Sequence, residues 1–217
     1  MTPTSKEITT QWRIEPDHEV LKTPIGTIRK GPLQSRTSMK RKNFYFFDFP
    51  DWVNIIARTP ESEILLIRQF RYGSKRMELE IPGGMIDPGE DPVEAGCREL
   101  LEETGFGGKK ATLIGRVCPN PAIQGNYCYT VLVEDAVRTA EPHPDDMEEI
   151  SWFRVLEQDI DRYIRDGRIE HGLVLNAFSH YERYKTEPAA LGTSGPGGSE
   201  SSSATSPVKQ LPGCGRS

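Results

Sequence analysis

The pattern of hydrophobic and polar positions along the chain predicts a mixed sheet with few helices. Runs rich in β-branched and aromatic residues, bounded by Pro, Asp, Gly or Asn, are typical of strands. Two other segments, 156–165 and 170–185, carry apolar residues at helical spacing. We therefore expect an α/β fold in which helices pack on a sheet. The predicted strands lie at residues 44–47, 52–57, 64–70, 112–117 and 127–133.

A third helix is predicted between Asp91 and Gly105. Asp91 can cap the helix, Pro92 suits the first helical position, and Glu94 stands where it would complete a capping box. Gly105 can adopt the left-handed conformation that commonly ends a helix. The helix should therefore begin near Pro92 and end before Gly105.

Three acidic residues crowd one face of this predicted helix. Glu102 and Glu103 follow Glu99 by three and four positions, and like charges at that spacing repel. Arg98 can pair with Glu102 but cannot compensate all three carboxylates. A hard divalent cation, Mg²⁺ or Mn²⁺, takes oxygen ligands and shares carboxylates with substrate phosphates. For these acids by themselves, a solvated acidic helix face is the alternative interpretation.

The residues around the three acids form a longer motif. Its spacing resembles the Nudix box, G-x5-E-x7-R-E-U-x-E-E-x-G-U, where U is aliphatic or aromatic, and every defined position matches. The resemblance implies the α/β/α sandwich of the Nudix hydrolase superfamily, with a mixed sheet and with the box as a loop–helix–loop. It also implies metal-assisted hydrolysis of a nucleoside diphosphate linked to another moiety. The matching residues are Gly84, Glu90, Arg98, Glu99, Leu100, Glu102, Glu103, Gly105 and Phe106.

The same resemblance assigns roles within the box. Glu99 and Glu103 resemble the principal metal ligands, Glu102 resembles an auxiliary ligand, and the carbonyl of Gly83 resembles a backbone ligand. Arg98 is similar to the residue that, with Glu90, orients the catalytic helix.

A general base is expected outside the box, before the last strand. The candidates are Glu148 and Glu149, and we favour Glu148 because Ile150 and Trp152 look like inward-facing strand positions. A base is recognised by its reach to the attacking water, so the sequence leaves the choice open. His143 and His171 are interpreted as surface or capping residues.

Resemblance beyond the box narrows the substrate class. The RQFR and ELEIPGG segments before the box are similar to the branch that acts on ADP-ribose and nucleotide sugars. In that branch an arginine contacts the phosphates and a glutamate helps hold the base or metal, which suggests Arg71 and Glu80 as substrate-binding residues. A surface arginine and a salt-bridged glutamate are the alternatives.

Pro121 lies 15 residues beyond Phe106, as in ADP-ribose pyrophosphatases, and is a third substrate-binding candidate. The PNPA sequence around it also resembles enzymes that act on GDP-mannose. We therefore expect hydrolysis of an ADP-ribose or GDP-mannose type of compound to a nucleoside monophosphate and a sugar phosphate. A non-catalytic Nudix-fold sensor of such a ligand is the alternative, although the intact acidic motif favours an enzyme.

The chain is expected to contain one domain at residues 1–186, followed by a disordered tail at 187–217 that is rich in Ser, Gly and Pro. The resemblance implies a homodimer, in which N-terminal strands within residues 1–50 could take part in dimerisation.

Composition limits the partners and the compartment. A formal net charge of −5 argues against nucleic acid as a ligand. The chain has no apolar run long enough for a membrane span and no apolar leader segment. Its four cysteines lack metal-type spacing, which favours a reducing compartment. We therefore expect a cytoplasmic protein that binds no membrane.

Overall fold

The computed structural model describes residues 11–143 and 149–186. The chain divides into two compact units. The first comprises Met1–Asp51 together with Cys118–Tyr127, and the second comprises Trp52–Val117 and Cys128–Ser217. The boundary after Asp51 lies next to the limit at residue 50 that the sequence suggested for the N-terminal segment.

The first unit is an antiparallel sheet with a long central strand. That strand, β3, pairs with β1 and β2 along one edge and with β4 along the other. The backbone N–H of Phe47 donates to the carbonyl of Ile123 at 2.7 Å, which connects the segment at 118–127 to this sheet. The strands are β1 (Trp12–Ile14), β2 (His18–Thr23), β3 (Gly26–Ser35) and β4 (Arg41–Asp48).

The second unit contains a mixed sheet in the order β10-β11-β5-β6-β13, with β7 paired to β6 and β8 paired to β5. The pair β5 and β11 is parallel, and the others are antiparallel. The short strands β9 (Phe106–Gly107) and β12 (Val137–Arg138) pair separately. The sheet strands are β5 (Trp52–Arg58), β6 (Glu63–Arg71), β7 (Arg76–Glu80), β8 (Gly83–Met85), β10 (Lys110–Val117), β11 (Cys128–Glu134) and β13 (Ser151–Leu156).

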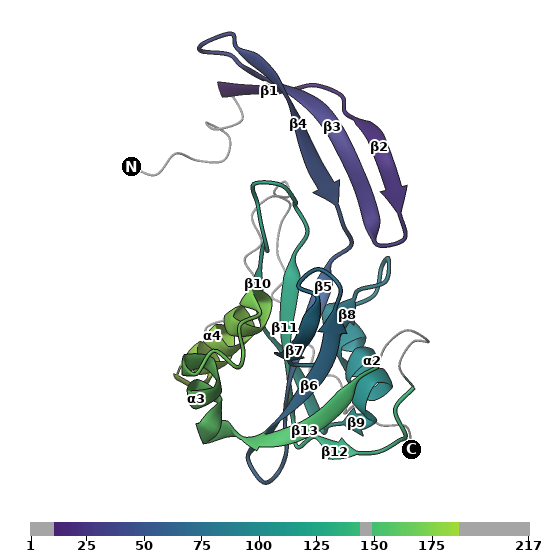
Figure 1. The fold of residues 1–217 in the computed structure, drawn as a ribbon, viewed down its shortest axis with the longest axis vertical. Helices are drawn as coiled ribbons and strands as arrows, with labels where there is room; N and C mark the ends of the chain where they lie inside the picture. Colours follow the sequence, from purple (N-terminus) through teal and green to yellow (C-terminus); the bar gives the residue numbers. More distant parts are fainter. Residues whose placement is uncertain (1–10, 144–148, 187–217) are drawn as a thin grey trace, which may run out of the picture. The chain divides into compact units, whose positions relative to one another are not determined.

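Helices cover both faces of this sheet (Figure 1). Neighbouring strand residues point to opposite faces, and Leu132 packs in one core cluster while Val131 and Val133 pack in the other. The Leu132 cluster includes residues of α4 (Gly172–Thr186), and α3 (Ile160–Arg165) packs there too. The second cluster includes residues of α2 (Pro92–Thr104). The predicted α/β/α arrangement is confirmed.

Local signals place both ends of α2. The Asp91 side chain accepts the N–H of Val93 at 2.8 Å, with Pro92 in the first turn. At the other end Gly105 has φ 74°, and its N–H donates to the carbonyl of Leu101. The Asp91 side chain thus caps the helix through Val93 rather than through the expected capping box with Glu94. Glu94 places its negative charge in the first turn of the helix.

All five predicted strand runs are confirmed, within β4, β5, β6, β10 and β11. The predicted helix at 156–165 was wrong at its start. Leu156 is the last residue of β13, paired with Glu63, and a 3₁₀ turn at Glu157–Asp159 precedes α3. The strand ladder with β6 outweighs the helical spacing of the apolar residues there. In the described part of the chain no helix is long and apolar enough to cross a membrane.

Candidate functional site

Arg98 is the centre of a cluster of acidic groups on α2 and the loop before it. Its Nε and Nη2 donate to the two carboxylate oxygens of Glu90 at 2.9 and 3.0 Å. Its Nη1 donates to Glu99 at 2.9 Å and to Glu102 at 3.0 Å, and Nη2 also reaches the carbonyl of Met85 at 3.1 Å. One guanidinium therefore fixes the loop, the helix and strand β8 relative to one another.

Electrostatics reinforce this arrangement. The hydrogen bonds from Arg98 lower the pKa of Glu90, against the opposing effect of burial, and the backbone N–H of Asp87 adds a further bond at 3.0 Å. The carboxylates of Glu90, Glu99 and Glu102 raise the pKa of Arg98. Glu90 and Arg98 therefore stay ionised at neutral pH. Three carboxylates face one cation, which leaves an excess of negative charge on this face.

Glu103 and two glycines connect α2 to β8. The side chain of Glu103 is buried, and its Oε2 accepts the backbone N–H of Gly83 at 3.0 Å. Gly84 faces Glu99, and a β-carbon at position 84 would overlap the Glu99 carboxyl group. The absence of a side chain at Gly84 therefore allows the strand to approach the acidic face of the helix.

The donor chemistry of this cluster fits a hard divalent cation. Glu99, Glu102 and Glu103 offer carboxylate oxygens on neighbouring turns of α2, which is the ligand type that Mg²⁺ and Mn²⁺ take. Within residues 11–143 and 149–186, no three acidic, His or Cys side chains are already gathered as a metal site. Arg98 instead bonds to oxygens of Glu99 and Glu102.

A second charged group lies on the β6–β7 hairpin. Nε and Nη2 of Arg71 donate to the two carboxylate oxygens of Glu80, both at 2.8 Å. His171 Nδ1 lies 3.1 Å from Glu80 Oε2. Burial would raise the pKa of Glu80, but the bonds from Arg71 and His171 outweigh burial and lower this pKa to about 2. The two residues that the sequence suggested for substrate binding are thus paired with each other.

Among the predicted residues of the motif, the structure places Gly83 against Glu103, and Arg98 against Glu99 and Glu102. His171 was interpreted as a surface or capping residue, and its contact with Glu80 was missed. No local pattern could have revealed that contact, because the two residues are far apart in the sequence.

Pro121 belongs to the first compact unit. Glu148, the favoured base, lies outside the described residues, and its neighbour Glu149 is exposed.

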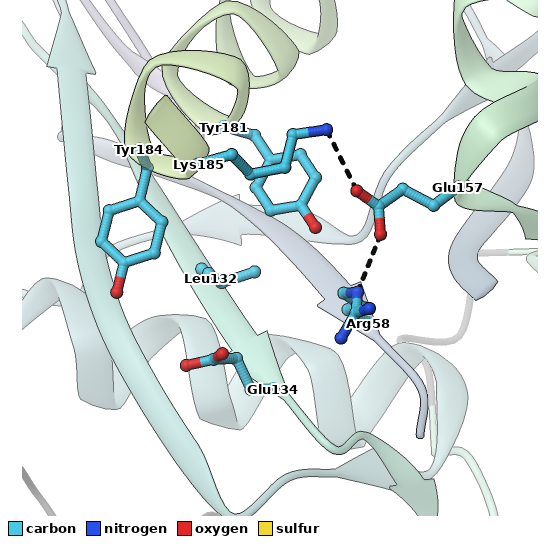
Figure 2. Close-up of a pocket in the computed structure, with 7 residues that line it drawn as sticks. All are labelled: Arg58, Leu132, Glu134, Glu157, Tyr181, Tyr184 and Lys185. Carbon is cyan, nitrogen blue, oxygen red and sulfur yellow. Dashed lines mark hydrogen bonds and ion pairs between the residues drawn. The ribbon is translucent and has the colours of Figure 1, made fainter. Parts of the chain in front are cut away.

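A cavity of about 360 Å³ lies on the other face of the sheet, beside α4 (Figure 2). Its charged groups are compensated in place. Glu157 accepts from Arg58 at 2.8 Å and from Lys185 at 3.1 Å, and Glu134 accepts from Lys110 at 2.7 Å. The two bonds at Glu157 link Lys185, at the C-terminal end of α4, to Arg58 of the sheet, and the cavity shows no excess charge for a ligand. Its lining comprises Arg58, Leu132, Glu134, Glu157, Tyr181, Tyr184 and Lys185.

Comparison with known proteins gives consistent matches. A family model described as NUDIX domain matches residues 48–170. The chain is 36% identical over 86 residues to an ADP-ribose pyrophosphatase of Bacillus subtilis (strain 168), which covers 40% of this chain and 46% of the relative. It is 33% identical over 111 residues to an ADP-sugar pyrophosphatase of Mus musculus, covering 51% of this chain and 50% of the relative. The chain thus spans about half the length of these curated relatives.

A solved structure described as a crystal structure of ADP compounds hydrolase has a similar fold. Its TM-score is 0.73 at 21% sequence identity, and the match covers 83% of this chain and 97% of that chain. At this level of identity the likeness concerns the fold alone.

Proposed function

This chain belongs to the NUDIX family, and we propose that it hydrolyses the diphosphate bond of a nucleoside diphosphate sugar of the ADP-ribose or GDP-mannose type. The products would be a nucleoside monophosphate and a sugar phosphate. The names of the two curated relatives, an ADP-ribose pyrophosphatase and an ADP-sugar pyrophosphatase, support this substrate class.

The observation that carries the proposal is the set of carboxylates on α2. Glu99, Glu102 and Glu103 lie on the helix that Arg98 ties to Glu90 and to β8. The negative charge of this face exceeds the positive charge of Arg98, so the face would by itself repel a diphosphate. The arrangement is useful for diphosphate chemistry once a cation is shared between the carboxylates and the substrate.

We propose that Mg²⁺ or Mn²⁺ is held by Glu99, Glu102 and Glu103 together with the carbonyl of Gly83. When bound, such a cation neutralises phosphate charge and lowers the pKa of the attacking water. The protein's own contribution is positional. Arg98 keeps the helix in place through Glu90, and the N–H of Gly83 holds the Glu103 carboxylate against β8.

The reaction needs a water oxygen to form a bond to phosphorus while the bridging P–O bond breaks. The proton of that water must pass to a base within hydrogen-bonding reach. Glu148 remains our proposal for this base, with Glu149 as the neighbouring alternative. Arg71, Glu80 and Pro121 remain the proposed substrate-binding residues.

Product analysis would test the function directly. Purified protein with Mg²⁺ would be incubated with ADP-ribose, GDP-mannose, ADP-glucose, NADH and diadenosine polyphosphates, and phosphate would be measured after phosphatase coupling. We expect release from ADP-ribose or a nucleotide sugar, with strict dependence on the added cation. Binding of one of these ligands without turnover of any would favour the non-catalytic sensor.

We also propose that the protein is a cytoplasmic homodimer. Exposed aromatic side chains on the sheet of the first unit support the proposal of a protein partner. Phe44 and Tyr45 of β4 are both exposed, although consecutive strand residues point to opposite faces. Trp12 and Ile14 of β1 are exposed as well. Sedimentation equilibrium on the full chain would measure the mass, and a monomer at micromolar concentration would contradict the dimer.

A further inference from the structure

Glu80 is a buried carboxylate held between polar side chains from two distant parts of the second unit. Its side chain is only 3% exposed. Arg71 approaches from the end of β6, and His171 approaches from the segment that directly precedes α4. A buried charge costs free energy unless polar partners compensate it. If one of the two partners is lost, the Glu80 carboxylate therefore depends more strongly on the other.

The two partners differ in how firmly the fold holds them. Arg71 is the last residue of β6, beside the turn to β7, and its long side chain is 42% exposed. His171 is followed by α4, whose first turns bury Val174, Ala177 and Phe178 in the core. His171 is therefore a fixed neighbour of Glu80, whereas the Arg71 side chain can reorient towards a ligand.

Glu80 is close in sequence to Gly83, which contacts the acidic cluster on α2. Only Ile81 and Pro82 separate Glu80 from Gly83, and three residue steps span at most about 10 Å. The N–H of Gly83 in turn holds Glu103. A diphosphate bound beside Glu103 would therefore be within reach of the Arg71 side chain.

We propose that His171 is a positioning residue for substrate binding: it holds the Glu80 carboxylate, so that Arg71 can turn from Glu80 to a substrate phosphate. The inference rests on the proposed function. When Arg71 leaves, Nδ1 of His171 still lies 3.1 Å from Glu80 Oε2 and so keeps a polar contact with the carboxylate. Without His171, the buried Glu80 carboxylate would depend on Arg71. Glu80 would then hold Arg71 more tightly, and the substrate phosphate would compete less well for the Arg71 side chain.

Substitutions of His171 test the inference. His171→Ala removes the polar contact with Glu80, whereas His171→Asn keeps a neutral N–H group near the position of Nδ1. Glu170→Gln is the matched control, because Glu170 pairs with Arg76 at 2.6 Å and so connects the same hairpin to the same end of α4 without contacting Glu80. Melting temperatures of all three variants would show whether each is folded.

We expect His171→Ala to raise the KM for ADP-ribose or GDP-mannose by about ten-fold, the size expected when a polar contact with a charged group is lost. The kcat should stay within about three-fold of the wild type. His171→Asn should restore KM to within about three-fold, and Glu170→Gln should leave KM unchanged. An unchanged KM in His171→Ala would overturn the inference, as would an equal rise in all three variants or a loss confined to kcat.

Calorimetric titration with the same two ligands separates this inference from the proposed function. If the wild-type protein binds a ligand but does not hydrolyse it, only the proposed hydrolysis fails, and the variants must then show the same ranking in Kd. If the wild-type protein neither binds nor hydrolyses either compound, both proposals fail.

Discussion

The two charged clusters on opposite faces of the central sheet contain similar residues but differ in net charge. Around Arg98, three glutamates share one cation. Around Glu157, one carboxylate is shared by Arg58 and Lys185, and Lys185 also pairs with Glu182. The second cluster is neutral and stabilises the end of α4. The first has surplus negative charge, which costs stability and suits a site that binds a cation.

The largest expected effect lies on the acidic face. Glu103→Gln should lower kcat by at least about 10³-fold, because it removes a charge from the proposed metal ligands but retains an oxygen to accept the Gly83 N–H. The melting temperature should change by only a few degrees. Steady-state assays with Mg²⁺ and calorimetry measure both quantities. Near-normal turnover in this variant would mean that Glu103 is not a metal ligand.

A compensated carboxylate should instead show its effect in the pH dependence of stability. Glu80 has a pKa of about 2 in the folded protein against an ordinary value of 4.5. A lowered folded pKa contributes stability above about pH 4.5, and this contribution disappears as the pH falls towards 2. The difference corresponds to about 3 kcal/mol.

Urea unfolding between pH 7 and pH 2 would measure this contribution. The free energy of unfolding of the wild-type protein should fall more steeply below pH 4.5 than that of Glu80→Gln. Parallel pH profiles for the two proteins would contradict the assignment of the ionised state to Glu80.

On the face that carries the cavity, Glu157→Gln should destabilise the fold without impairing the reaction. Two cations, Arg58 and Lys185, would lose their shared carboxylate, which should cost about 1–2 kcal/mol in the free energy of unfolding. Denaturant titration measures this cost, and kcat/KM is measured where the variant is fully folded. A decrease in kcat/KM beyond about three-fold would show that the two faces are coupled.

The smallest expected effect on stability is that of Glu102→Gln. The change removes an exposed bond to Arg98 and also relieves repulsion from Glu99, so the free energy of unfolding should change by less than about 0.5 kcal/mol. Turnover should nevertheless fall by about ten-fold. A loss of stability as large as in Glu157→Gln would remove the distinction between the two clusters.

The parts of the fold that are set by neighbouring residues were predicted from the sequence. The limits of α2 follow from Asp91 and Gly105, and the acidic face follows from helical spacing. The strands β5, β6 and β11 are strongly apolar because both faces of the sheet are covered.

Other features depend on contacts between distant residues. Strands β1, β2 and β3 of the first unit were not located from the hydrophobic pattern, because none of their residues is buried and they lack the alternation that identifies a half-buried strand. The contact between His171 and Glu80 requires the hairpin and the start of α4 to meet, and neither local sequence contains that information. Leu156 was assigned to a helix because the pairing with Glu63 across two strands is invisible in a single window.

The excursion of residues 118–127 into the first unit limits how the chain can be divided experimentally. A protease cut between Asp51 and Trp52 would not release that unit, since the peptide bonds at both ends of the excursion would still join the fragments. Expression from Trp52 onward would delete β4 and leave the Ile123 carbonyl without the Phe47 N–H that it accepts. Recombinant fragments intended to isolate the larger unit therefore need a short artificial linker in place of 118–127.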